Sequence, residues 1–192
     1  MAVLIAGLVI FLGMHSIAIF SPDLRARALA RFGEGGWKIC YSVISLLGFA
    51  ALIYGFGLAR QNPIVLYTPP PWARHVTLLL MVPVFPLLLA AYLPGRIKAT
   101  LKHPMLAAVK LWAFAHLLAN GTLADVLLFG GFLAWAVLDR ISWKRRPPQK
   151  LNTAPPGRFN DAIAIVGGLA LYVVFILWAH RWLIGVSPLP GH

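Results

Sequence analysis

Histidines within apolar stretches are the residues of this chain best suited to chemistry. His15 and His116 each lie inside a long apolar run, whereas His75, His103 and His180 lie nearer the ends of such runs. An ionisable side chain at membrane depth costs a few kcal/mol, and such residues commonly serve function. Only five acidic residues and one cysteine accompany the six histidines. Neutral imidazoles with so few carboxylate or thiolate partners favour haem iron over zinc.

Helical geometry limits which histidines can act together. At about 100° per residue, Trp112, His116 and Asn120 share one face of a helix predicted over 104–120. His103 lies roughly 140° around the same helix from His116. His103 and His116 therefore cannot bind one iron together, and the partner of His116 must come from another helix.

Several partners remain open for His116. His15 is the most deeply placed alternative, but its predicted depth differs from that of His116 by roughly 15 Å at 1.5 Å per residue. Pairing His15 with His103, or His116 with His75 or His180, matches the depths better.

A purely structural interpretation of these polar residues stands beside the functional one. Each histidine could hydrogen-bond a neighbouring helix or a water molecule at the membrane edge. Asp125 opens the helix that follows the Asn120–Gly121 turn. It could hydrogen-bond the His116 imidazole and set its tautomer, as carboxylates do for the histidine ligands of metals.

The elements that must position these residues are membrane-spanning helices. The chain is 60% hydrophobic and only 11% charged, against about 25% charged residues in ordinary soluble domains. A crossing needs about twenty apolar residues. That criterion selects six segments, 2–20, 37–59, 75–93, 104–120, 122–139 and 161–184. We therefore predict an all-α integral membrane bundle of about six transmembrane helices, forming a single domain over residues 1–192.

The distribution of basic residues predicts orientation and excludes a nucleic-acid partner. Of the 17 Lys and Arg residues, thirteen fall in the first, third and fifth connections and three on the other side. By the positive-inside rule, both termini should face away from the cytoplasm. The basic residues behind the net charge of +12 should then form a cytoplasmic stripe that includes the loop WKRRPPQK. We expect this stripe to contact anionic lipid headgroups.

Prolines mark loops and one kink. The run YTPPPW cannot continue a helix, so residues 63–74 should form an external loop. Pro83 and Pro86 lie inside the third segment. There they should kink the helix and free one or two carbonyls for other partners, either for packing or for function.

The chain resembles the NnrU family of bacterial membrane proteins. The stretch AHLLANGTLADVLLFG, from Ala115 to Gly130, matches the helical hairpin typical of that family. The early His15–Ser16 pair, the basic stretch around Arg25 and the LPGRI segment at 93–97 are also similar. The resemblance implies a bacterial inner-membrane protein associated with denitrification and nitrogen-oxide metabolism.

The same family is similar to zeta-carotene isomerase, a membrane enzyme that uses haem b to isomerise a carotenoid double bond. His103–Pro104 and Trp112 keep the spacing of its motif. The resemblance implies His116 and His15 as haem ligands. Trp112 and Asn120, on the same helix face, and Asp125, just across the turn, are the residues expected to support His116. The motif cysteine falls at Ala113, so a cysteine-to-histidine ligand exchange is unavailable there, while bis-histidine binding is still possible.

Two functional hypotheses follow, with membrane lipids as partners in both. The first is a haem-b protein with a redox or isomerase role on a hydrophobic, lipid-like small molecule. The second is a noncatalytic accessory or transport protein of nitrogen-oxide metabolism, whose polar residues hold the helices together. The substrate and the oligomeric state are left open by the sequence.

Overall fold

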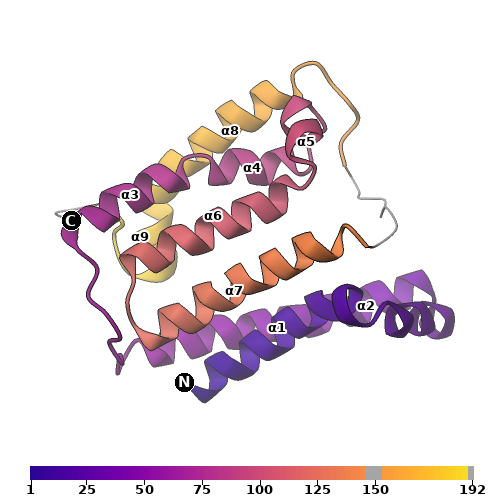
Figure 1. Ribbon diagram of the computed structural model, residues 1–192, viewed down its shortest axis with the longest axis horizontal. Helices are drawn as coiled ribbons and strands as arrows, with labels where there is room; N and C mark the ends of the chain where they lie inside the picture. The colour runs from indigo at the N-terminus through magenta and orange to yellow at the C-terminus, as the bar shows by residue number, and fades with distance from the viewer. Residues whose placement is uncertain (146–152, 190–192) are drawn as a thin grey trace. The chain divides into compact units, whose positions relative to one another are not determined.

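The protein is built of α-helices, as predicted. The computed structural model describes residues 1–145 and 153–189, and no β-strand occurs among them apart from an isolated bridge between Val65 and Thr122. Figure 1 shows the helices, which are α1 (Ala2–Phe20), α2 (Pro22–Ala59), α3 (Pro71–Met81), α4 (Val84–Ala90), α5 (Arg96–Leu101), α6 (Pro104–Ala119), α7 (Leu123–Ser142), α8 (Asn160–Val174), the π-helix η1 (Phe175–Ala179) and α9 (His180–Ile184).

Helices occur at all six predicted segments. Four stretches are long and apolar enough to cross a membrane by length and composition: Ala2–Phe20, Pro22–Ala59, Pro71–Ala90 and Asn160–Ile184. The helix α6 is shorter, with 16 residues. The helix α7 has 20 residues but carries Asp125, Asp139 and Arg140. These helices identify an all-α membrane protein, while the crossing number of six stays a prediction.

Large apolar side chains on the outside of the helices agree with a lipid environment. Val9, Leu79 and Val166 are 66%, 71% and 68% exposed, although they belong to three different helices. Such surfaces are unusual for a protein surrounded by water. In the hydrocarbon of a membrane, exposed apolar side chains carry no hydrophobic free-energy penalty.

The chain divides into two compact units, each described here by itself. The first comprises Met1–Thr68 and Asn120–Arg146, and the second Pro69–Ala119 and Pro147–His192. The basic loop WKRRPPQK, at 143–150, falls mostly outside the described residues. The single domain expected over residues 1–192 stays a prediction.

Glycines bring α1 and α2 of the first unit into close contact. A Cβ atom on Gly7 would overlap the backbone of Leu52, and one on Gly55 would overlap the backbone of Leu4. Because early α1 meets late α2, the two helices are antiparallel. Small residues that let backbones approach in this way are typical of membrane helix pairs.

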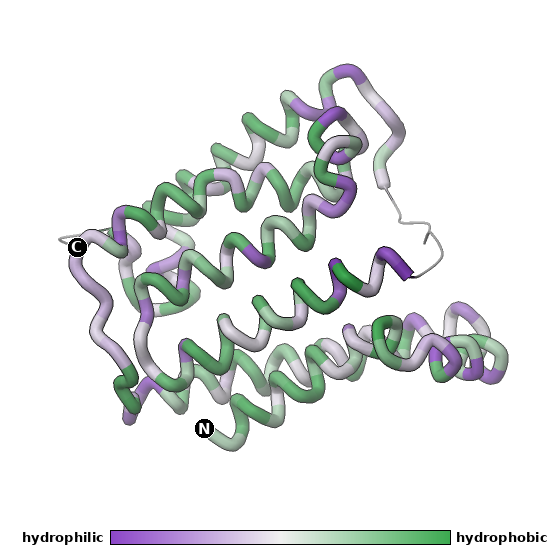
Figure 2. The backbone as a smooth tube through the Cα atoms, viewed as in Figure 1, coloured by the Kyte–Doolittle hydropathy of each residue, from purple (hydrophilic) through white to green (hydrophobic). Residues whose placement is uncertain are grey.

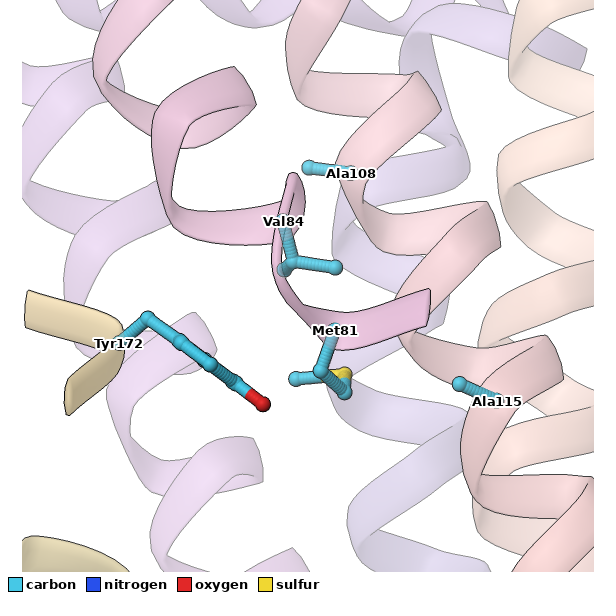
Figure 3. Packing of buried hydrophobic residues seen from close by; sticks show 5 residues of the cluster. All are labelled: Met81, Val84, Ala108, Ala115 and Tyr172. Carbon is cyan, nitrogen blue, oxygen red and sulfur yellow. The ribbon is translucent and has the colours of Figure 1, made fainter. Parts of the chain in front are cut away.

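The core of the second unit lies between α3, α4, α6 and α8. Figure 3 shows Met81, Val84, Ala108, Ala115 and Tyr172, with the Tyr172 side chain directed toward Met81. The contact between α4 and α8 is also a glycine contact, since a Cβ atom on Gly168 would overlap Pro86.

The predicted proline kink is confirmed, and its freed carbonyl has a partner. Helix α3 ends at Met81 and α4 begins at Val84. The Val82 N–H donates to the carbonyl of Leu79 at 3.2 Å, not to that of Leu78. The Leu78 carbonyl instead accepts a hydrogen bond from the Tyr172 hydroxyl at 2.8 Å. The kink therefore serves packing between α3 and α8.

Candidate functional site

His15 lies in α1 with one ring nitrogen already engaged. Its Nδ1 atom lies 2.7 Å from the carbonyl oxygen of Phe11, and its ring is half-buried. A carbonyl can only accept, so Nδ1 must carry the proton of this hydrogen bond. In the neutral imidazole the lone pair is then on Nε2, the nitrogen available to a metal.

Aromatic rings from three helices surround His15. Its ring centroid lies 4.2 Å from that of Phe11, 5.3 Å from Tyr41 and 6.0 Å from Trp135, which meets it edge-on. The buried Trp135 Nε1 has no hydrogen-bond acceptor within the part of the chain that the structure describes. A buried indole N–H without an acceptor costs about 1–3 kcal/mol, so the surroundings of His15 hold a donor for a further group.

His116 repeats the geometry of His15 in α6. Its Nδ1 atom lies 2.9 Å from the carbonyl oxygen of Trp112, one helical turn earlier, and the two rings are 5.5 Å apart. By the same argument, Nδ1 of His116 carries the proton, and in the neutral ring the lone pair is on Nε2. Trp112 thus sets the His116 tautomer through its backbone carbonyl, a role that the sequence did not reveal.

The other histidines are placed less favourably for binding together with His116. His103 directly precedes α6, and thirteen residues at 1.5 Å put it roughly 20 Å along the axis from His116. His75 is exposed. Thr77 faces α6, donating to the Ala115 carbonyl at 2.7 Å, and His75 lies about 200° around α3 from Thr77. The structure therefore does not bring His75 to His116.

His180 is engaged at the C-terminal end of the second unit. Its Nδ1 atom lies 2.7 Å from the Val186 carbonyl oxygen, and its ring meets Phe175 edge-on at 5.7 Å. It follows the π-helix η1 directly.

Asp125 has a structural role in the turn between α6 and α7. Its carboxylate accepts hydrogen bonds from the Thr122 N–H at 3.1 Å and the Thr122 hydroxyl at 2.6 Å, and its own N–H donates to that hydroxyl at 3.3 Å. This capping box begins α7. The T-x-x-D spacing in the sequence indicates such a cap.

Asn120 and Gly121 form the turn itself, outside both helices. The predicted helix face therefore keeps Trp112 and His116 but loses Asn120, because α6 ends at Ala119. The Asn120 carbonyl accepts the Tyr67 hydroxyl at 2.7 Å. A Cβ atom on Gly121 would overlap the Tyr67 carbonyl oxygen, so only glycine fits this position.

Tyr67 is the residue of this turn that sequence reasoning missed. It comes from the proline-rich loop between α2 and α3. This loop is shorter than the predicted 63–74, because Pro71 begins α3, where the first helical turn needs no N–H donor from proline. Nothing local predicts the contact of Tyr67 with residues far along the chain. Partial burial, with a smaller contribution from the charge of Asp125, raises the pKa of the Tyr67 phenol.

The LPGRI segment is also explained by local contacts. Its Pro94 carbonyl accepts the Asn160 side-chain amide at 2.8 Å. The Asp161 carboxylate accepts the backbone N–H groups of Arg96 at 2.7 Å and Ile97 at 3.1 Å. Gly95 leaves room for that carboxylate. Asp161, in the first turn of α8, therefore caps the N-terminus of another helix, α5.

Haem iron needs fewer protein ligands than a metal ion held by side chains alone. Within residues 1–145 and 153–189, no group of three or more His, Cys, Asp or Glu side chains could hold a metal ion. Haem needs only one or two axial imidazoles, each neutral with a lone pair. In a neutral ring, the Nδ1 hydrogen bond of His15 or His116 leaves the lone pair on Nε2, and an N–H bound to a backbone carbonyl is the usual support of a metal-bound histidine.

Comparison with known proteins identifies the family. The family model described as NnrU protein matches residues 3–188. No curated protein and no solved structure matches the chain. Since the match covers nearly all of the sequence, the chain belongs to the NnrU family.

Proposed function

We propose that this NnrU membrane protein binds haem b through histidine Nε2 atoms, with His15 and His116 each as a candidate ligand. The observation that supports the proposal is the shared hydrogen bond from Nδ1 to the carbonyl four residues earlier, 2.7 Å at His15 and 2.9 Å at His116. Both histidines lie in apolar helices, where an unexplained imidazole is unusual.

The residues around each histidine would hold the ring in one orientation. The carbonyls of Phe11 and Trp112 fix the proton on Nδ1, and neighbouring aromatic rings restrict rotation of the imidazole. A bound haem would supply a redox-active iron. An apolar helical protein suits a lipid-like substrate, and the proposed chemistry is redox or double-bond isomerisation.

We also propose a place in the bacterial inner membrane with both termini on the non-cytoplasmic side. The excess of basic residues in alternate connections supports the assignment of sides. The helix directions within each unit agree with crossings that alternate in direction. In the first unit α1 is antiparallel to α2. In the second, Thr77 meets Ala115 and Val84 clusters with Ala108, so α3 and α4 are antiparallel to α6.

A noncatalytic accessory role in nitrogen-oxide metabolism is the second candidate. It is favoured by the structural use of the family hairpin. Gly121 and Asp125 there form a turn and a helix cap.

An absorption spectrum of the purified protein tests the proposal. Protein expressed with sufficient haem and extracted in mild detergent should show a Soret band with a low-spin, bis-imidazole pattern. His15→Ala and His116→Ala should each abolish or convert that pattern without loss of membrane-inserted protein. His75→Ala is the matched control, because His75 is exposed, and should leave the spectrum unchanged.

Two results would contradict the proposal. A colourless preparation of the unmodified protein would exclude haem binding and favour the accessory role. A normal spectrum in both ligand variants would show that His15 and His116 are not the ligands.

A further inference from the structure

The first turns of α2 form a separate amphipathic segment, residues 22–32, which we call the arm. The long helix Pro22–Ala59 contains one non-helical residue, Gly33, with φ 69° and ψ 173°. A positive φ of this size favours glycine. The chain thus changes direction at Gly33, and the arm does not continue the axis of the spanning part of α2.

Connectivity puts the arm at a membrane boundary. It begins directly after α1 and ends at the kink before the apolar remainder of α2. These two helices are antiparallel neighbours, since Gly7 meets Leu52 and Gly55 meets Leu4. The end of α1 and the start of the spanning part of α2 therefore lie at the same boundary. A segment that joins them lies there too.

The composition of the arm suits this boundary. Leu24, Ala28 and Phe32 recur every four residues and form one row along the helix. Leu24 and Phe32 are 46% and 56% exposed, so about half of each apolar side chain is left uncovered by the described residues. Arg27 and Arg31 form a neighbouring row. Figure 2 shows how hydrophilic residues gather in this part of α2, in contrast to the apolar α1.

A second basic segment of the first unit lies at the same end. Phe11 of α1 meets Phe132 of α7 at 5.7 Å, and His15 meets Trp135 at 6.0 Å. Both contacts advance together along the chain, so α1 and α7 are parallel. Arg140 in the last turns of α7, and Lys144 just after the helix, therefore lie at the end where the arm begins.

We propose that the arm is an interfacial helix that binds anionic phospholipid headgroups. Leu24 and Phe32 enter the boundary of the acyl chains, and Arg25, Arg27 and Arg31 bind the lipid phosphates. Planar guanidinium groups bind phosphate oxygens in pairs. An apolar row beside basic residues is the pattern of helices that lie in the interface plane. The positive charge selects anionic over zwitterionic lipid.

Lipid-selective quenching on the full-length protein tests this proposal. Cys40 is the chain's single cysteine. A Cys40→Ala, Ala30→Cys protein carries one fluorophore on the arm, because Ala30 is exposed. The protein is reconstituted in phosphatidylcholine liposomes with a minor fraction of phosphatidylglycerol. Either lipid then bears a nitroxide near its headgroup. Nitroxide-labelled phosphatidylglycerol should quench the fluorophore more strongly than nitroxide-labelled phosphatidylcholine does. Added salt should reduce this difference in quenching.

Charge variants separate lipid binding from a general effect of charge. Each arginine contributes about fivefold in affinity for an anionic surface, so replacing Arg25, Arg27 and Arg31 by Gln should remove the selectivity. Replacing the three by Lys should keep most of it. Arg60→Gln, Arg74→Gln and Arg181→Gln together remove the same charge from the other predicted side and should leave the selectivity intact.

Two outcomes would overturn the proposal. Equal quenching by both labelled lipids in the unmodified arm would show that it does not select anionic lipid. Persistence of the selectivity after replacement by Gln would show that the arginines do not cause it. An acidic protein partner as the true ligand would appear as the first of these outcomes.

Discussion

Single residues decide how the family hairpin is held. The carbonyls of Asn120 and Gly121 accept hydrogen bonds from the loop around Tyr67, and Asp125 begins α7. The strongest sequence signature of the chain is thus explained by folding chemistry. In His15 and His116, by contrast, the hydrogen bond from Nδ1 to the carbonyl four residues earlier defines the tautomer of the neutral ring.

Removing the Tyr67 hydroxyl should weaken the hairpin measurably. In Tyr67→Phe the Asn120 carbonyl loses its 2.7 Å donor, and we expect the free energy of unfolding in detergent to fall by about 1 kcal/mol. Tyr54→Phe is the control, since Tyr54 is 65% exposed in the same unit. An equal loss of stability in both variants would contradict a specific role for the hydrogen bond.

The same tyrosine should make stability depend on alkaline pH. Partial burial and Asp125 raise the pKa of Tyr67 in the folded protein, against about 10 for an unperturbed phenol. The folded state therefore holds this proton more tightly than the unfolded state. Its contribution is complete below pH about 10 and is lost as pH rises through the folded pKa. Unfolding measured between neutral and alkaline pH should show a steeper loss for the unmodified protein than for Tyr67→Phe.

At the scale of elements, helices are joined by close backbone contacts and by carbonyls that prolines release. Gly7, Gly55 and Gly168 each face the backbone of a neighbouring helix. Tyr172 binds the carbonyl freed before Pro83. The contacts of Gly7 and Gly55 hold α1, the helix that carries His15, against α2.

An added methyl group should distinguish a packed glycine from an open one on the same helix. Gly55→Ala would place Cβ against the backbone of Leu4, whereas Gly57 has nothing within 4 Å. We expect Gly55→Ala to lower the free energy of unfolding by roughly 1–3 kcal/mol. Gly57→Ala should leave it unchanged or raise it slightly, because alanine favours helix. Chemical unfolding in detergent measures both, and equal values would refute the close contact.

The kink predicts a cost for losing the Tyr172 hydroxyl. Tyr172→Phe leaves the Leu78 carbonyl without its 2.8 Å donor. Hydrogen bonds between membrane helices average about 0.6 kcal/mol and reach about 1.7 kcal/mol, so we expect a loss of stability within that range. Tyr92→Phe, at a residue that is 57% exposed, should be neutral. A neutral Tyr172→Phe would mean that the freed carbonyl finds another donor.

At the scale of the whole molecule, the distribution of basic residues predicts how the chain is oriented in the membrane. The basic connections follow alternate predicted crossings, and in the first unit two of them lie at the same helix ends. Lipid on all sides explains why large apolar residues remain exposed.

Topology reporters should place both termini on the non-cytoplasmic side. Fusions to the N-terminus and after residue 192 should be active only with a periplasmic reporter, because thirteen basic residues hold the alternate connections inside. Carbonate extraction should leave the protein in the membrane. A C-terminus on the cytoplasmic side would overturn the six-crossing topology.

The sequence alone was enough to predict a helix at each of the six apolar segments, the membrane environment and the kink at Pro83. It did not predict the helical start of α2 before residue 37, or α5, because neither is a long apolar run. Hydropathy and proline act through local chemistry, so a short window of residues contains the whole cause. The sequence also placed His15 and His116 inside apolar helices. It wrongly extended the Trp112 and His116 face to Asn120, because the end of α6 depends on a turn held by a distant loop.

Only the tertiary structure showed which polar groups meet. Tyr67 with Asn120, Tyr172 with Leu78 and Asp161 with Arg96 are separated by 53, 94 and 65 residues. No periodicity records such pairs, since each depends on the approach of two helices or loops. The tautomers of the histidines also became visible only there. Each tautomer follows from which ring nitrogen lies next to a carbonyl oxygen. That depends on the side-chain rotamer, which is set by the residues packed around the ring.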